Sequence, residues 1–70
     1  MKLSARNVLK GKVKKVNYGV VNSEVIVGLP HGYEIVSIVT KAAVEDLGLK
    51  EGKEVYAVIN ATDVILATDY

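Results

Sequence analysis

One long β-type stretch, residues 5–18, constrains the fold more than any other part of the chain. Apolar and polar residues alternate loosely along this stretch, with Val8 and Val16 on the same parity. This pattern predicts a single long strand. Gly11 lies in its interior, where glycine often marks a bend or a β-bulge. A small barrel needs such a bend when one strand serves two of its sides, so the stretch favours an all-β barrel.

The rest of the chain divides into short β-type segments and one helical segment. Asn17-Tyr18-Gly19 and Pro30-His31-Gly32 predict tight turns. A short helix is predicted over residues 41–47, with Thr40 as its N-cap and Gly48 as its stop. Further strands are predicted over residues 20–29, 34–39, 54–60 and 63–67. Five strands with a short helix between the third and the fourth form the order of an OB-type barrel, here as a single domain over residues 1–70.

The composition predicts that this domain associates with copies of itself. The chain has 70 residues, no cysteine and one histidine, so a disulfide or a zinc cluster cannot stabilise it. Half of the residues are hydrophobic, which is more than so small a domain can bury alone. The third predicted strand is apolar on both parities near Ile35 and Val36. We expect one of its faces to line the barrel and the other to contact a partner subunit.

The charges are unevenly distributed although the net charge is only +1. Six cationic residues precede the first acidic residue, Glu24; they are Lys2, Arg6, Lys10, Lys12, Lys14 and Lys15. This run is typical of a solvated strand face whose lysines protect an exposed sheet edge. It would also attract anions, and both interpretations remain open. The small net charge argues against a protein that works mainly on nucleic-acid phosphates.

The sequence predicts no contact with a membrane and no catalytic centre. No uncharged run approaches the roughly 18 residues of a membrane span, and the first residues lack a signal-peptide core. Together with the absence of cysteine, this makes the cytoplasm the expected compartment. No pairing of a nucleophile with a base is evident, and His31 stands alone in its turn, so we expect neither an enzyme nor direct metal ligation by the protein.

Two short polar segments interrupt the β-type pattern, at residues 4–7 and 60–62. They supply hydroxyls, amides and one guanidinium, which together suit a small oxyanion. Ser4 and Arg6 have the same parity, so on an extended strand they would project to one side about 6.5–7 Å apart. From chemistry alone this signal is weak, because an ordinary strand start with a surface arginine also explains these residues.

The order of these segments resembles a known family. Ser4-Ala5-Arg6-Asn7, Leu9-Lys10-Gly11, Gly48-Leu49-Lys50-Glu51-Gly52 and residues 58–65 are similar to the molbindin (Mop) group of TOBE domains. The resemblance covers nearly the whole chain. It implies a small OB-type barrel that binds molybdate or tungstate, needs no cofactor and assembles as a homo-oligomer, for which we expect a hexamer.

The resemblance also assigns the site. It implies that Ser4 and Arg6 contact the anion and that Thr40 reaches it from a neighbouring subunit. Asn60 and Ala61 occupy positions where family members commonly carry Lys followed by a small residue, often Ser, so this chain brings one positive charge fewer. Further contacts are expected from Asn7, Lys41 and Thr62.

The expected function is therefore non-catalytic binding of molybdate or tungstate, for storage or homeostasis of the oxyanion. One alternative is a nucleic-acid-binding OB domain, which would need an aromatic stacking platform. The chain offers four tyrosines for this purpose, namely Tyr18, Tyr33, Tyr56 and Tyr70. The other alternative is a structural or regulatory oligomerisation module with weak or lost anion binding, which Asn60 keeps open.

Overall fold

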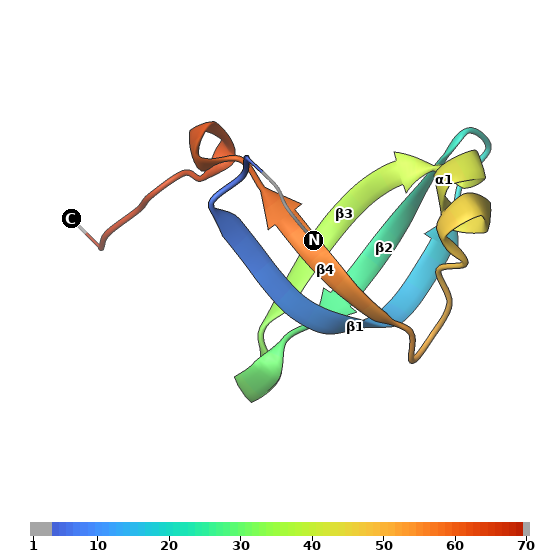
Figure 1. Ribbon diagram of the computed structural model, residues 1–70, viewed down its shortest axis with the longest axis horizontal. Helices are drawn as coiled ribbons and strands as arrows, with labels where there is room; N and C mark the ends of the chain where they lie inside the picture. Colours follow the sequence, from blue (N-terminus) through green and yellow to red (C-terminus); the bar gives the residue numbers. More distant parts are fainter. Residues whose placement is uncertain (1–3, 70) are drawn as a thin grey trace.

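A computed structural model describes residues 4–69, which form a curled four-stranded antiparallel sheet and one short helix (Figure 1). The strand order is β3-β2-β1-β4. Lys2 and Tyr70, which entered the predictions above, lie outside the described residues. The elements in chain order are β1 (Asn7–Tyr18), β2 (Asn22–Gly28), η1 (Pro30–Gly32), β3 (Glu34–Thr40), α1 (Lys41–Leu47), β4 (Glu54–Ile59) and η2 (Ala61–Asp63), where η denotes a 3-10 helix.

Strand β1 serves two sides of the curled sheet, as the sequence predicted. Its first half pairs with β4, from Asn7 opposite Ile59 onward, and its second half pairs with β2. The register shifts between Val13 and Lys15, at the point where β1 passes from one partner to the other. Gly11 stands just before this irregularity. A Cβ atom at Gly11 would lie 2.5 Å from the carbonyl oxygen of Gly28, so the sheet can curl tightly here only with glycine.

We expect Gly11→Ala to destabilise the fold by about 1–3 kcal/mol, because the added methyl group must push the backbone of β2 away. Urea unfolding of the variant and the parent measures the difference. Gly28→Ala is the matched control, since a Cβ atom there would approach nothing closer than the Lys12 carbonyl oxygen at 3.7 Å. Equal losses in the two variants would show that the approach at Gly11 does not limit the curl.

The core lies on the inner face of the curl, where α1 covers one end of it. Val13, Val25 and Val27 from the sheet and Val44 from α1 are at most 5% exposed. The helix begins and ends where the sequence predicted. The Thr40 hydroxyl accepts a hydrogen bond of 3.0 Å from the Ala43 N–H at its start, and Gly48 stops it in the left-handed conformation with φ 62°.

The predicted fifth strand and the closed barrel are not formed. Asp63 ends η2, and residues 64–69 belong to no strand. Strands β3 and β4 therefore remain the two edges of an open half-barrel. We call residues 64–69 the C-terminal tail; it runs away from the sheet (Figure 1). The reason is local, because η2 turns the chain outward at the end of β4 instead of folding it back along the strand.

One predicted turn is displaced and the other is confirmed. Asn17 and Tyr18 still pair with β2, so the first turn is centred on residues 19–21 and not on Asn17-Tyr18-Gly19. Pro30-His31-Gly32 does form a turn, in which His31 has φ 67°.

Candidate functional site

The end of the β1–β4 ladder brings four of the predicted site residues together. Asn7 opposite Ile59 is its last pair, so Arg6 and Asn60 flank that pair directly. Asn60 precedes η2, and its side chain forms no cap hydrogen bond there. Arg6, Asn60 and Ala61 are exposed and Asn7 is partly buried. We call Arg6, Asn7, Asn60 and Ala61 the ladder-end cluster.

The remaining residues of this end are less closely defined. Ser4 lies two residues before Arg6 in a bend, and the strand begins only at Asn7. The strand geometry assumed for Ser4 and Arg6 is therefore wrong, although both stay on the same exposed segment. Thr62 lies within η2. Within residues 4–69 Arg6 forms no ion pair, so its guanidinium is available to an anion.

Thr40 and Lys41 form a second group at the junction of β3 and α1. Thr40 pairs with Asn22 across the sheet, and the Lys41 N–H donates to the Val21 carbonyl oxygen at 3.0 Å. Because the Thr40 hydroxyl oxygen accepts from the Ala43 N–H, its own proton remains to be donated elsewhere.

The two groups lie far apart in one chain. The twelve-residue strand β1 begins at the ladder-end cluster and ends beside β2 near α1. At about 3.3 Å per residue it spans several times the width of a tetrahedral oxyanion, even when bent. Figure 1 shows η2 and α1 toward opposite ends of the molecule. A single chain therefore does not place Thr40 around an anion that Arg6 holds.

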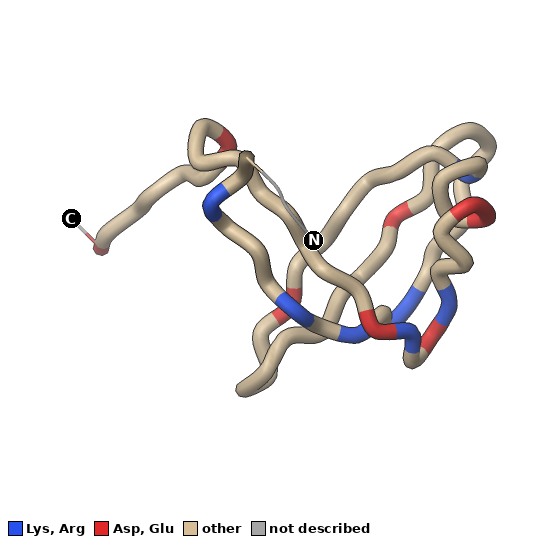
Figure 2. Tube along the Cα trace, in the orientation of Figure 1, with Lys and Arg blue, Asp and Glu red and all other residues tan. Residues whose placement is uncertain are grey.

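Acidic partners neutralise part of the basic face of β1. Lys14 pairs with Glu34 at 2.5 Å and Lys10 with Glu54 at 3.6 Å, both on the surface. Figure 2 shows lysines along β1 with acidic residues on its neighbours. The exposed tyrosines do not form a row, because Tyr18 ends β1, Tyr33 precedes β3 and Tyr56 lies within β4. The described residues thus lack the stacking platform that a nucleic-acid surface requires.

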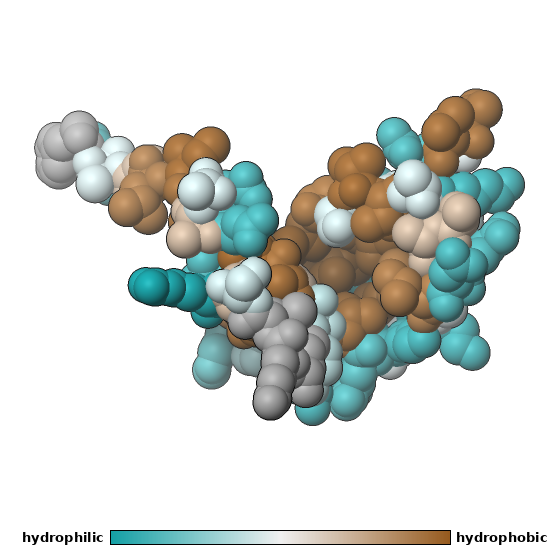
Figure 3. Space-filling view, turned by 45° about the horizontal axis from the view of Figure 1, so that its top comes forward, coloured by the Kyte–Doolittle hydropathy of each residue, from teal (hydrophilic) through white to brown (hydrophobic). Residues whose placement is uncertain are grey.

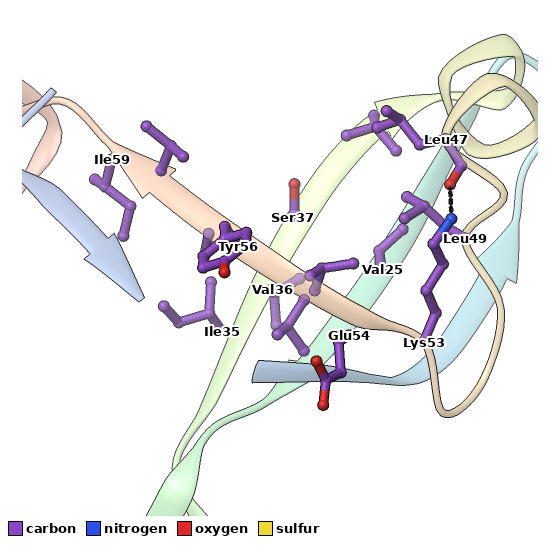
Figure 4. Close-up of a pocket in the computed structure, with 15 residues that line it drawn as sticks. Val25, Ile35, Val36, Ser37, Leu47, Leu49, Lys53, Glu54, Tyr56 and Ile59 are labelled. Atoms are coloured by element: carbon purple, nitrogen blue, oxygen red, sulfur yellow. Dashed lines mark hydrogen bonds between the residues drawn. The ribbon is translucent and has the colours of Figure 1, made fainter. Parts of the chain in front are cut away.

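An apolar groove of about 620 Å³ opens between the edge strands β3 and β4. Figure 4 shows Ile35 from β3 and Ile59 from β4 among the side chains that line it, with Leu49 toward α1. Figure 3 shows this hollow as a continuous apolar surface. At one end, Lys53 donates a hydrogen bond to the Leu47 carbonyl oxygen and so holds the loop after α1.

Sequence reasoning missed this groove because it assigned residues 63–67 to the same sheet. The apolar run Val64-Ile65-Leu66 lies within this predicted fifth strand. In the structure Ile65 is 92% exposed and Leu66 is 89% exposed. The sequence therefore identified an apolar run after β4, but it did not show that this run lies outside its own sheet.

The described residues offer no alternative centre. Within residues 4–69 no three or more His, Cys, Asp or Glu side chains gather as they would around a metal ion. None of the helices in this range is both long enough and apolar enough to cross a membrane.

These features define a small all-β domain of the half-barrel type, with a polar cluster at one end and an open apolar groove. Residues 3–66 match the model of the TOBE domain. The chain belongs to the TOBE domain family.

Its relatives include proteins of known binding function. Molybdenum-pterin-binding protein 3 of Clostridium pasteurianum is 48% identical over 66 residues, which are 94% of this chain and 97% of that protein. The structure of MopII from Clostridium pasteurianum superposes with a TM-score of 0.89 at 46% identity, over 96% of this chain and all of MopII. The cytoplasmic molybdate-binding protein ModG, solved with molybdate bound, gives a TM-score of 0.90 at 54% identity, over 93% of this chain and 46% of ModG.

Proposed function

We propose that this protein binds molybdate without catalysing a reaction, and that it stores the oxyanion or keeps its cytoplasmic level steady. The observation that carries the proposal is the ladder-end cluster, where Arg6 and Asn60 flank the last pair of the β1–β4 ladder and Arg6 forms no ion pair within residues 4–69. The binding of molybdate by ModG, a relative that is 54% identical, supports this assignment.

The mechanism follows from the donors present. A tetrahedral dianion accepts charge-assisted hydrogen bonds from Arg6 and neutral ones from Ser4, Asn60 and the Ala61 N–H. Asn7, Lys41 and Thr62 are further candidates. Protein atoms contact only the oxygens, so the metal itself gains no ligand from the protein. Tungstate has the same charge and shape and is a second expected ligand, whereas rejection of sulfate has to depend on the size of the pocket.

The complete site requires a second copy of the chain. Thr40 and Lys41 lie at the other end of the molecule from Arg6, so a neighbouring subunit has to supply them. The Thr40 hydroxyl is suited to this role because its oxygen already accepts a bond and its proton is left to donate. We propose a homo-oligomer with shared sites, and a hexamer in line with the family resemblance.

The groove and the tail support this assembly. The edges β3 and β4 leave backbone N–H and C=O groups unpaired along an apolar groove, and the exposed Ile65 and Leu66 offer apolar side chains on a segment that belongs to no strand. A strand added at such an edge satisfies the backbone groups and buries alternate side chains. We propose that the tail of one copy fills the groove of another.

Asn60 and Ala61 favour a second candidate function, that of an oligomerisation module with weak or lost anion binding. Neither residue brings a charge to the ladder-end cluster. The assembly would then be the same, and only the anion would be missing.

Native mass spectrometry with molybdate, tungstate, sulfate or no anion separates the two functions, because it measures the size of the oligomer and the number of bound anions together. We expect an oligomer that retains molybdate and tungstate but not sulfate. An oligomer that retains none of the three anions would favour the module without a ligand. A folded monomer at micromolar concentration would contradict the shared site.

We expect Asn60→Lys to strengthen molybdate binding and to make it less sensitive to salt. A charge added at about 4 Å contributes roughly 4 kcal/mol at an effective dielectric of 20. Desolvation of the ammonium group reduces this gain to about 1–2 kcal/mol. Calorimetric titration at low and high ionic strength measures the effect, with the neutral Asn60→Gln as control. Equal or weaker binding by Asn60→Lys would show that this position does not face the anion.

A further inference from the structure

We infer that an anion bound at the oxyanion site also holds the turn that directs the C-terminal tail. Anion binding and insertion of the tail into another subunit then strengthen each other, and we call this coupling the lock. This inference rests on the proposed function and adds a regulatory link between its two parts. The observation behind it is that three of the residues assigned to the anion, Asn60, Ala61 and Thr62, belong to the short segment that turns the tail outward.

The segment 60–63 is the only covalent connection between the sheet and the tail. On one side it is anchored by the last ladder pair, Asn7 with Ile59. On the other side it continues into the exposed tail. Rotation within these residues therefore decides whether the tail points toward another subunit or back toward its own sheet.

Two hydrogen bonds define the turn. The Asp63 N–H donates to the Asn60 carbonyl oxygen at 2.9 Å, and the Val64 N–H donates to the Ala61 carbonyl oxygen at 3.4 Å. Both acceptors belong to residues of the ladder-end cluster. The second bond is long, so the turn is weakly closed where the tail begins.

An anion held between Arg6 and Asn60 would fix this turn. Arg6 is on the strand side of the cluster and Asn60 and Ala61 are in the turn, so a ligand shared by them joins the turn to the ladder. The bound anion then favours the turn that sends the tail outward. By thermodynamic linkage, a tail seated in another subunit favours anion binding by the same factor, typically five-fold or more.

Amide hydrogen exchange, measured by NMR on the full chain, tests the lock. Saturating molybdate should slow exchange at the Asp63 and Val64 amides at least fivefold. The Gly19 amide, which donates to the Asn22 carbonyl oxygen in a distant turn, should be unaffected. Arg6→Ala should abolish the protection. Bound molybdate without protection at these two amides would overturn the lock alone, whereas absence of bound molybdate would overturn the proposed function together with the lock.

A pair of variants at Asp63 separates the lock from simple sharing of the anion between subunits. Asp63→Gly and Asp63→Ala remove the same carboxylate, but glycine loosens the turn. We expect Asp63→Gly to bind molybdate about two- to fivefold more weakly than Asp63→Ala, as the extra backbone freedom of glycine implies. Native mass spectrometry of mixed labelled and unlabelled copies should show subunit exchange accelerated by a similar factor. Equal values for the two variants would overturn the inference.

Discussion

A chain that ends at Asp63 is expected to lose stable self-association. In the proposed assembly, removing residues 64–70 leaves the groove between β3 and β4 without Val64, Ile65 and Leu66 of another copy. Full burial of each such side chain contributes about 1.5–3 kcal/mol, so the loss per groove is on the order of 5 kcal/mol. Sedimentation velocity should therefore show a shift from oligomer to monomer at micromolar concentration.

Two point variants test the same association in a full-length chain, so that the result does not depend on the folding of the truncated chain. Ile65→Ser and Leu66→Ser keep the full length and should weaken association in the same direction. Val20→Ser is the matched control, because Val20 is 97% exposed in the turn between β1 and β2 and does not line the groove. Circular dichroism reports whether each chain is folded. Unchanged oligomers in both tail variants would show that the tail does not fill the groove.

The second large effect is expected at Arg6. Replacing Arg6 by alanine removes the one guanidinium of the ladder-end cluster while leaving the core untouched. Charge-assisted hydrogen bonds contribute roughly 1.5–3 kcal/mol each, so the loss of two of them should weaken molybdate binding at least tenfold. Isothermal titration calorimetry measures the affinity, and thermal unfolding should show a stability close to that of the parent.

Lys12→Ala is the control for this variant. Lys12 is an exposed cation of β1 outside the ladder-end cluster, and within residues 4–69 it forms no ion pair. Its removal lowers the general positive field without touching the site. If Arg6→Ala retained the affinity of the parent, Arg6 would be an ordinary surface residue. If both variants weakened binding equally, diffuse charge and not the ladder-end cluster would attract the anion.

The predicted effects on self-association and on molybdate binding both involve the turn after β4. The turn after β4 carries Asn60 and Ala61 and also sets the direction of the tail. In the proposed assembly a neighbouring copy completes the site, because Thr40 caps α1, which lies toward the other end of each chain (Figure 1). Binding and assembly are then expected to change together when this turn is altered.

Local pattern alone was sufficient for most of the elements. The Thr40 cap, the helical run after it and Gly48 determine α1 through contacts within a few residues, and Gly11 marks the long strand that has to curl. Loose alternation between turn residues located the four strands of the sheet. The positions of Arg6 and Asn60 in polar segments indicated a donor-rich site, although the chemistry of single residues could not separate it from an ordinary strand start.

Tertiary structure decided the rest, because it depends on contacts between distant residues. Only the register of β1 with β4 shows that Arg6 and Asn60 flank the same ladder pair, more than fifty positions apart in the sequence. Only the direction of the turn after β4 shows that Val64, Ile65 and Leu66 leave their own sheet. Alternation describes which face a segment buries but not which chain supplies the partner. For this reason the residues of the expected fifth strand lie in a tail outside the sheet, and the expected barrel is an open half-barrel with a groove between β3 and β4.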